Sequence, residues 1–442
     1  MSKHVIVIGG GPAGIEAARA AAQAGAKVSL ISEGPVGGRA GWHSLLPSKA
    51  WLAAADAAGQ QQEGPFASGG ALPAPGAILP WLQTLKETWS SQQVAELKAL
   101  GVTIVSGVAA LTGPNSVVVA DGEGQETARL TGDALIIATG SVPFFPPNLR
   151  PNGKTVIAPR FMSALGALPA SVAVIGAGAT GVEAVYLFNR LGIPVTWIVD
   201  KFGVLPAYPA PAGELLAEIL VRRGVRLVRV EAADHIAETA DGIAVVMADG
   251  KREAAALAFV AIGRTADLGR LNLAAAGLEV AAGQFPAVDS FCQTGVAGVY
   301  AVGDAAGGPM VANRATAMAR VAGRHAAAAA VAPYKPEAVV AAIYSDPQVA
   351  QVGRPGEGKT TRVNYGAGLK AHLLAETEGF VELSYDETGR VLGGVAVGAH
   401  AGDVLAPVAL AIQVGANMAD LAAVYAAHPT LSELAFAAAR QA

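Results

Sequence analysis

The sequence predicts an α/β fold in which one βαβ unit occurs twice, followed by an α+β segment near the C-terminus. Residues 4–32 and 171–200 both read as an apolar strand, a glycine turn, an alanine-rich helix and a second apolar strand. Residues 381–398 read as two strands around an Asp-Glu-Thr-Gly turn. The repeated unit indicates two similar domains, and the later strand pair indicates a third of a different kind.

Length, charge and hydropathy narrow the class of protein. A chain of 442 residues is too long for one ordinary core, which favours two to four domains. The formal net charge of -4 and the scattered basic residues do not suggest a nucleic-acid or lipid-headgroup partner. The uncharged runs 64–85 and 161–182 contain proline and glycine, so neither predicts a regular membrane helix. The N-terminus enters a strand pattern without a signal-like leader, and a cytoplasmic location is expected.

Each repeated unit carries the spacing Gly-x-Gly-x-x-Gly between its first strand and its helix. The first glycine permits a tight turn, the second lets the backbone approach a pyrophosphate, and the third allows close helix-strand packing. One copy could be a turn that binds nothing, but two copies framed by strand and helix predict two dinucleotide sites. The glycines are Gly9, Gly11 and Gly14 in the first unit and Gly176, Gly178 and Gly181 in the second.

Two further turns follow apolar strands, and they extend the pattern over nearly the whole chain. These are DALIIATGS, with Thr139 and Gly140, and GVYAVGDAA, with Gly303 and Asp304. With them the sequence resembles the pyridine nucleotide-disulfide oxidoreductases, the flavoproteins that include dihydrolipoamide dehydrogenase. The resemblance implies FAD on the first unit, NAD(P)H on the second, and a C-terminal domain that builds a homodimer.

The family order also implies a domain plan of two Rossmann-like dinucleotide-binding domains, for FAD and NAD(P), and a C-terminal α+β dimerisation domain. The FAD-binding domain is expected in two chain segments, with the NAD(P)-binding domain inserted between them. The expected boundaries are 1–148 and 266–335 for the FAD domain, 149–265 for the NAD(P) domain and 336–442 for the dimerisation domain.

The resemblance assigns roles to residues around the flavin. Asp304 would bind the ribityl chain, Ala109 the adenine edge, and Ala312 would face the flavin pyrimidine from a helix N-terminus. Lys49 and Glu183 would form the ion pair beside flavin N5, which favours a working hydride-transfer site. The alternative is an unrelated, solvated lysine and glutamate.

Two further pairs follow from the same comparison. Gly263 and Arg264 match the strand-turn near the nicotinamide half. His428 and Glu433 match the family dyad that reaches across the dimer to protonate a thiolate. Since a histidine bound to a carboxylate is common in structure as well as in catalysis, this dyad either protonates a reduced acceptor or holds the interface together.

The redox cysteines of the family are missing. Their places are taken by Ala40 and Leu45, and the single cysteine, Cys292, cannot form an intramolecular pair. A disulfide relay is therefore excluded, and no metal site is predicted. Trp42, between the two vacated places, would either cap a flavin face or fill the core.

Nucleotide choice depends on the acid at the end of each second strand. The positions expected to hold it are Ser32 and Val199, with Glu33 and Asp200 one step later. A carboxylate at 200 would repel a 2'-phosphate, which favours NADH, whereas Lys201 keeps NADPH open as a second donor.

The sequence thus predicts an FAD-dependent oxidoreductase that passes electrons from NADH to a quinone-like or other small acceptor without thiols. Phe66 and Trp81, in the segment 64–85, would form an apolar lip over the acceptor or belong to a disordered surface insertion. The rival interpretation is a flavoprotein without turnover, acting as a redox sensor or assembly partner.

Overall fold

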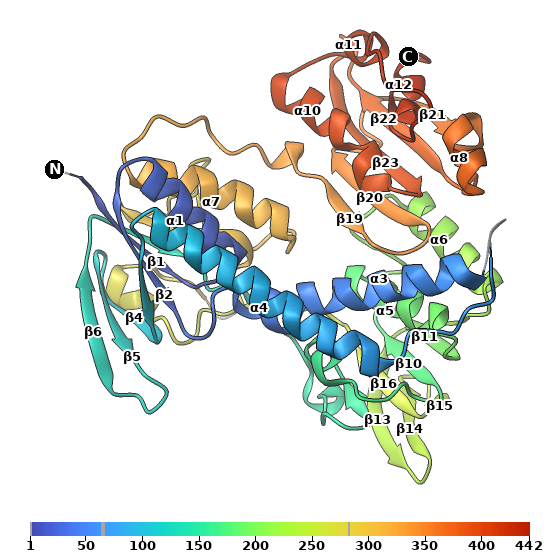
Figure 1. Ribbon diagram of the computed structural model, residues 1–442, viewed down its shortest axis with the longest axis horizontal. Coiled ribbons are helices and arrows are strands. Elements are labelled where there is room, and N and C mark those ends of the chain that lie inside the picture. Colours follow the sequence, from blue (N-terminus) through green and yellow to red (C-terminus); the bar gives the residue numbers. More distant parts are fainter. Residues whose placement is uncertain (1, 63–66, 282) are drawn as a thin grey trace. The chain divides into compact units, whose positions relative to one another are not determined.

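The computed structural model describes residues 2–62, 67–281 and 283–442 (Figure 1). The chain divides into two compact units, each assembled from three separate segments. The first unit combines Met1–Pro47, Pro80–Phe144 and Arg264–Lys335, and the second combines Ser48–Leu79, Phe145–Gly263 and Pro336–Ala442.

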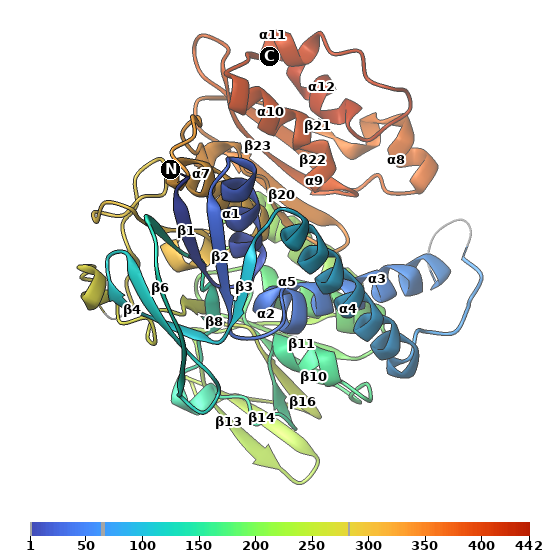
Figure 2. The same ribbon diagram turned by 60° about the vertical axis from the view of Figure 1, so that its left-hand side comes forward.

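The first unit is built on a five-stranded parallel sheet in the order β18-β7-β1-β2-β3, and Figure 2 shows β1, β2 and β3 side by side. Its central strands are almost fully buried, as expected for a parallel sheet covered on both faces. The strands are β1 (His4–Ile8), β2 (Lys27–Ser32), β3 (Thr103–Ser106), β7 (Ala134–Ile137) and β18 (Val299–Ala301).

The two faces of this sheet are covered differently. Helices α1 (Pro12–Gln23) and α7 (Ala312–Ala326) pack against each other, and both contribute to the core on one face (Figure 1). The other face shares its core with an antiparallel sheet of β4 (Val108–Gly113), β5 (Ser116–Ala120) and β6 (Glu126–Thr131). The predicted first βαβ unit is confirmed, since β1 and β2 pair in parallel around α1.

Two helices follow β2 in the chain. Helix α2 (Gly38–His43) belongs to the first unit, and α3 (Leu45–Gln62) continues into the second unit from Ser48 onward. Strands β8 (Ser141–Pro143) and β17 (Arg264–Ala266) form an antiparallel pair that joins distant parts of the chain.

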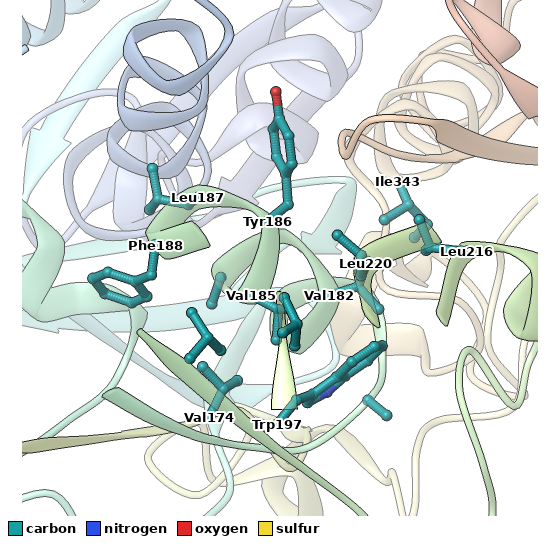
Figure 3. Close-up of a cluster of buried hydrophobic side chains, with 14 of the residues drawn as sticks. Val174, Val182, Val185, Tyr186, Leu187, Phe188, Trp197, Leu216, Leu220 and Ile343 are labelled. Atoms are coloured by element: carbon teal, nitrogen blue, oxygen red, sulfur yellow. The ribbon is translucent and has the colours of Figure 1, made fainter. Parts of the chain in front are cut away.

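The second unit repeats the parallel sheet, in the order β12-β11-β10-β16-β9. The predicted second βαβ unit is confirmed by the parallel pairing of β10 with β11 around α5. Figure 3 shows the buried cluster beneath α5, where Val182 and Val185 lie near Trp197 and Val174 while Tyr186 points away from them. The elements are β9 (Val156–Ile157), β10 (Val172–Ile175), α5 (Ala179–Arg190), β11 (Val195–Val199), α6 (Ala210–Arg222), β12 (Arg226–Arg229) and β16 (Leu257–Val260), with an antiparallel sheet of β13 (Ala233–Thr239), β14 (Gly242–Met247) and β15 (Arg252–Ala255).

The C-terminal part of the second unit is an antiparallel sheet in the order β19-β20-β23-β22-β21, with helices packed on it. The strand pair predicted at 381–398 is confirmed as β22 and β23. The elements are β19 (Ala341–Ile343), β20 (Gln348–Gly353), β21 (Lys359–Asn364), α8 (Leu369–Leu374), β22 (Phe380–Tyr385), β23 (Val391–Gly398), α9 (Ala401–Val404), α10 (Ala406–Val414), α11 (Met418–Ala422) and α12 (Glu433–Ala439). These sheets confirm the predicted α/β class with two Rossmann-like domains and a C-terminal α+β domain.

The prediction for residues 64–85 is wrong in part. Residues 75–85 belong to the long helix α4 (Pro75–Ala99), which continues through Pro80, rather than to a disordered insertion. Trp81 on this helix is 48% exposed, whereas Phe66 lies outside the described residues. Within the described ranges, no helix combines the length and apolar character that a membrane span requires.

Candidate cofactor and redox site

In the first glycine turn, two of the motif glycines leave no room for a side chain, and the remaining one does. A Cβ on Gly14 would lie 1.7 Å from the Gly9 carbonyl oxygen, and one on Gly9, whose φ is +118°, would lie 2.3 Å from the Ala138 carbonyl oxygen. A Cβ on Gly11 would meet nothing within 4 Å. The turn therefore needs Gly9 and Gly14 for its own packing, while the backbone at Gly11 faces open space at the start of α1.

The second glycine turn repeats this arrangement independently. A Cβ on Gly181 would lie 2.2 Å from the Gly176 carbonyl oxygen, and one on Gly178 would meet nothing within 4 Å. The buried Trp197 indole donates a hydrogen bond to the Gly176 oxygen at 3.0 Å and fixes the turn from below. Both turns thus present a free helix N-terminus and an open glycine, which is the arrangement that accepts a dinucleotide pyrophosphate.

A polar cluster follows β7 in the first unit. The Ser141 hydroxyl donates to the Asp304 carboxylate and accepts a bond of 2.7 Å from Arg264 Nε, while Arg264 Nη2 donates to the Ser141 carbonyl at 2.9 Å. Burial lowers the pKa of the Arg264 guanidinium, with Asp304 opposing that effect. Asp304 thus lies at the turn where the FAD contact is predicted, and the structure brings Arg264 to it although the sequence assigned Arg264 to the nicotinamide half.

The buried Thr139 hydroxyl tests whether these residues fit the cofactor. Thr139 Oγ1 has no hydrogen-bond partner among the described residues, although it is shielded from solvent. A buried polar atom of this kind usually has a partner. It lies beside Gly140, whose φ of +72° forms the turn after β7. An unsatisfied hydroxyl and an open glycine at the same sheet edge fit a bound FAD.

Glu33 does not point into free space at the end of β2. Its carboxylate binds Arg270 through two bonds of 2.7 and 2.8 Å, and this pairing holds the pKa of Glu33 below its ordinary value. Asp267 lies 3.6 Å from Arg270 and accepts a 2.7 Å bond from Arg39, which also donates to the Thr139 carbonyl. Sequence reasoning missed Arg39, Asp267 and Arg270 because this chain of ion pairs joins segments more than 200 residues apart.

The predicted ion pair of Lys49 and Glu183 is present in the second unit. Lys49 Nζ lies 2.6 and 2.8 Å from the two Glu183 oxygens, and the Tyr344 backbone N–H donates to the same carboxylate at 3.1 Å. The Lys49 ammonium also lies 4.4 Å from the centroid of the Tyr344 ring. Burial raises the pKa of the Tyr344 hydroxyl, so this ring stays neutral. Tyr344 is a third member of the site that sequence reasoning did not find.

The two positions vacated by cysteine carry no redox group. Ala40 lies in α2 and Leu45, 41% exposed, begins α3. Between them, the half-buried Trp42 donates from Nε1 to the Val36 carbonyl at 3.1 Å, and the Lys86 ammonium lies 5.7 Å from its ring centroid. The only cysteine, Cys292, is fully buried, and burial raises the pKa of its thiol to about 12. No thiol chemistry is available at this site.

At the end of β11, the side chain of Asp200 makes a local hydrogen bond. One carboxylate oxygen of Asp200 accepts the Phe202 N–H at 3.0 Å and closes a turn. Lys201 binds Glu231 at 2.6 Å, and Phe202 is 69% exposed. Both charged side chains of the segment therefore have local partners.

The remaining predicted residues lie as follows. His428 Nδ1 and the Glu433 carboxylate are 3.0 Å apart, and Glu433 also accepts the Thr430 N–H at 2.7 Å, which lowers the pKa of Glu433 together with the histidine. Ala109 is buried in β4 and Ala312 begins α7. The described ranges contain no cluster of His, Cys, Asp and Glu that could hold a metal ion.

Two family models match the chain. The model described as pyridine nucleotide-disulphide oxidoreductase matches residues 3–319, and the dimerisation domain of the same class matches residues 339–439. An NAD(P)H dehydrogenase (quinone) from Mycobacterium tuberculosis is 30% identical, with 100% of this chain and 94% of that protein covered. A dihydrolipoyl dehydrogenase from Chlorobaculum parvum is 33% identical, with 97% and 94% covered.

Solved structures show the same fold. The crystal structure of LpdA from M. tuberculosis superposes with a TM-score of 0.93 at 29% identity, covering 99% of each chain. The flavoprotein disulfide reductase RclA from Escherichia coli, solved with Cu(II), reaches a TM-score of 0.86 at 20% identity, covering 100% of this chain and 99% of that one, a likeness of fold alone.

Proposed function

Because this chain belongs to the pyridine nucleotide-disulphide oxidoreductase family, whose members use FAD and NAD(P)H, we propose that it is an NADH:quinone oxidoreductase. One observation carries the choice of acceptor: the ion pair of Lys49 and Glu183 is intact, whereas the two cysteine positions hold Ala40 and Leu45. The site retains groups for handling NADH and lacks those for handling a disulfide.

The chemistry of the cofactor fits an acceptor that needs no thiol. When bound, FAD would supply hydride chemistry with a reduced nicotinamide and both one- and two-electron chemistry with an acceptor. A quinone takes electrons in either way, so it needs neither a cysteine relay nor a metal. The similar M. tuberculosis protein named NAD(P)H dehydrogenase (quinone) supports this choice. Other relatives are named dihydrolipoyl dehydrogenase, and this chain has no cysteine pair that could react with a dihydrolipoyl dithiol.

The residues of the chain would act by binding and orientation. The open turns at Gly11 and Gly178 would hold the two pyrophosphates. Glu183 and the Tyr344 ring fix the Lys49 ammonium, so its position does not need to be organised when the nicotinamide arrives. His428 and Glu433 would either donate a proton to the reduced acceptor or hold a dimer interface.

NADH is the proposed donor. At the end of β11 the carboxylate of Asp200 would repel a 2'-phosphate, and Lys201, the nearest cation in sequence, is engaged by Glu231. NADPH is expected to serve as a weaker donor.

The proposed assembly is a homodimer in the cytoplasm, built through residues 336–442, with the domain boundaries predicted from the sequence. The dimerisation-domain match at residues 339–439 supports this assembly.

An anaerobic titration tests the proposal. NADH and then NADPH are added to the purified protein while flavin absorbance is recorded, and a soluble quinone follows. Bleaching by NADH and recovery with quinone are expected, with no turnover of dihydrolipoamide and NAD⁺. A flavin that stays oxidised would favour the second candidate, a redox sensor or assembly partner without turnover, for which the missing cysteines are the supporting observation. A reduced flavin that quinone does not reoxidise would contradict the acceptor.

A further inference from the structure

The two glycines before Arg39 lie directly against the first glycine turn. The Gly37 N–H donates to the Gly10 carbonyl at 2.8 Å, and a Cβ on Gly38 would lie 2.8 Å from Gly11 Cα. The chain therefore packs against Gly11 immediately before it reaches Arg39, on a different side of Gly11 from the open one. This close packing brings the start of α2, which includes Arg39, next to the first glycine turn.

The Arg39 guanidinium is held from one side only. Its Nη2 donates to both the Thr139 carbonyl and the Asp267 carboxylate, each at 2.7 Å. Among the described residues, Nε and Nη1 have no partner, and the side chain is 36% exposed. Arginine presents five N–H donors in a planar fork. The orientation of this one is fixed by two bonds while its remaining donors are uncommitted.

The surroundings of Arg39 are those of an anion site. The free helix N-terminus at Gly11 favours negative charge, and the buried Thr139 hydroxyl has no partner within the described part of the chain. Guanidinium groups bind phosphate oxygens in two-point geometry, and such charge-assisted bonds are among the stronger ones in proteins. Three kinds of donor therefore lie at the same edge of the sheet.

Two acidic residues, Asp267 and Glu33, belong to the same chain of ion pairs as Arg39. Asp267, with only 19% of its side chain exposed, would repel a diphosphate if Arg39 were absent, because Arg270 approaches it only to 3.6 Å. Arg270 in turn binds Glu33 through both oxygens. Two arginines and two acids thus balance in charge, with Arg39 at the end that meets the glycine turn.

We propose that Arg39 is a ligand of the FAD diphosphate, oriented by Asp267 and the Thr139 carbonyl. Its charge also shields the cofactor from the Asp267 carboxylate. The proposal concerns how the cofactor is held and does not depend on the identity of the electron acceptor. The competing explanation is a purely structural ion pair between Arg39 and Asp267.

The rate at which holoenzyme releases FAD after dilution, followed by flavin fluorescence, tests the proposal. R39M is expected to release FAD about tenfold faster or more, and R39K by less than R39M, because a lysine keeps the charge without the fork. The control is R129M, since Arg129 makes an exposed ion pair with Glu126 in β6, and its release rate should not change. Excess FAD should restore full flavin occupancy of R39M, which shows that the variant is folded.

D267N separates the two explanations. It removes the carboxylate that repels the diphosphate and keeps an oxygen that can accept from Arg39, so FAD release is expected to be no faster than in the wild type. If the pair were only structural, R39M and D267N would accelerate release alike, and that result would overturn the proposal. An unchanged release rate in R39M would overturn it as well.

Discussion

Lys49 and Glu183 stand 134 positions apart in the sequence, yet the lysine ammonium contacts both carboxylate oxygens at 2.6 and 2.8 Å. The pair joins α3 to α5 within the second unit, and the side chains are 35% and 12% exposed. Such partial burial makes the geometry better defined than that of a typical surface ion pair.

Breaking this pair is expected to impair flavin reduction. K49M should slow the reduction of bound flavin by NADH by roughly 10–100-fold, because an ordered cation is lost from the site. Stopped-flow absorbance measures this step alone. The matched control is R222M, since Arg222 forms an exposed pair with Glu378 and should leave the rate unchanged. An equal effect in both variants would indicate a general loss of stability instead of a role at the site.

Tyr344 provides a finer test of how Lys49 is held. Its backbone N–H binds Glu183 whatever its side chain, whereas only the ring lies over the lysine ammonium. Y344L should therefore slow flavin reduction about threefold to tenfold, since a cation–π contact at a partly exposed site contributes roughly 0.5–1 kcal/mol and the ring also orders the lysine. Y344F keeps the ring and should match the wild type. If the rate of flavin reduction fell as far in Y344F as in Y344L, the hydroxyl and not the ring would be responsible for the effect.

Electron transfer should not involve the thiol of Cys292. Burial raises its pKa to about 12, so thiol reagents should label the native protein negligibly and should label one thiol once the protein is unfolded in urea. C292A should retain quinone reduction. Loss of turnover in C292A, with flavin reduction by NADH intact, would place the thiol on the path to the acceptor and contradict the proposed function.

The sequence predicts the backbone turns of this site better than it predicts the side-chain contacts. The two Gly-x-Gly-x-x-Gly motifs, which begin at Gly9 and Gly176, can be recognised because a tight turn between strand and helix needs glycine at fixed local offsets. The roles of Arg39, Asp267 and Tyr344 cannot be predicted in this way, because they depend on partners brought together by strand pairing between distant segments. The helical form of residues 75–85 was missed because proline is common in loops, while the side chains that α4 buries on its neighbours are invisible in local composition.

Acid conditions should weaken the dyad of His428 and Glu433. The Thr430 N–H, and then His428, lower the pKa of Glu433 from its ordinary 4.5. A carboxylate with a lowered folded pKa stabilises the fold above its unfolded pKa and loses that contribution as pH falls through the folded value. E433Q should therefore lower the thermal midpoint by about 1–3 °C at pH 7. This gap should narrow as the pH falls below about 4.5 and vanish once the pH lies below the lowered folded pKa. Exposed Glu337 supplies the control variant E337Q, which should show no gap at either pH.

The second glycine turn allows stability and binding to be separated. A Cβ on Gly181 would collide with the Gly176 carbonyl, so G181A should lower the thermal midpoint of the protein as well as its affinity for NADH. A Cβ on Gly178 meets open space, so G178A should keep the wild-type midpoint and still bind NADH at least about tenfold more weakly, because the methyl group would stand where the pyrophosphate approaches. Thermal unfolding without nucleotide and NADH titration of flavin reduction measure the two effects. Wild-type NADH affinity in G178A would mean that the nucleotide does not lie on this turn.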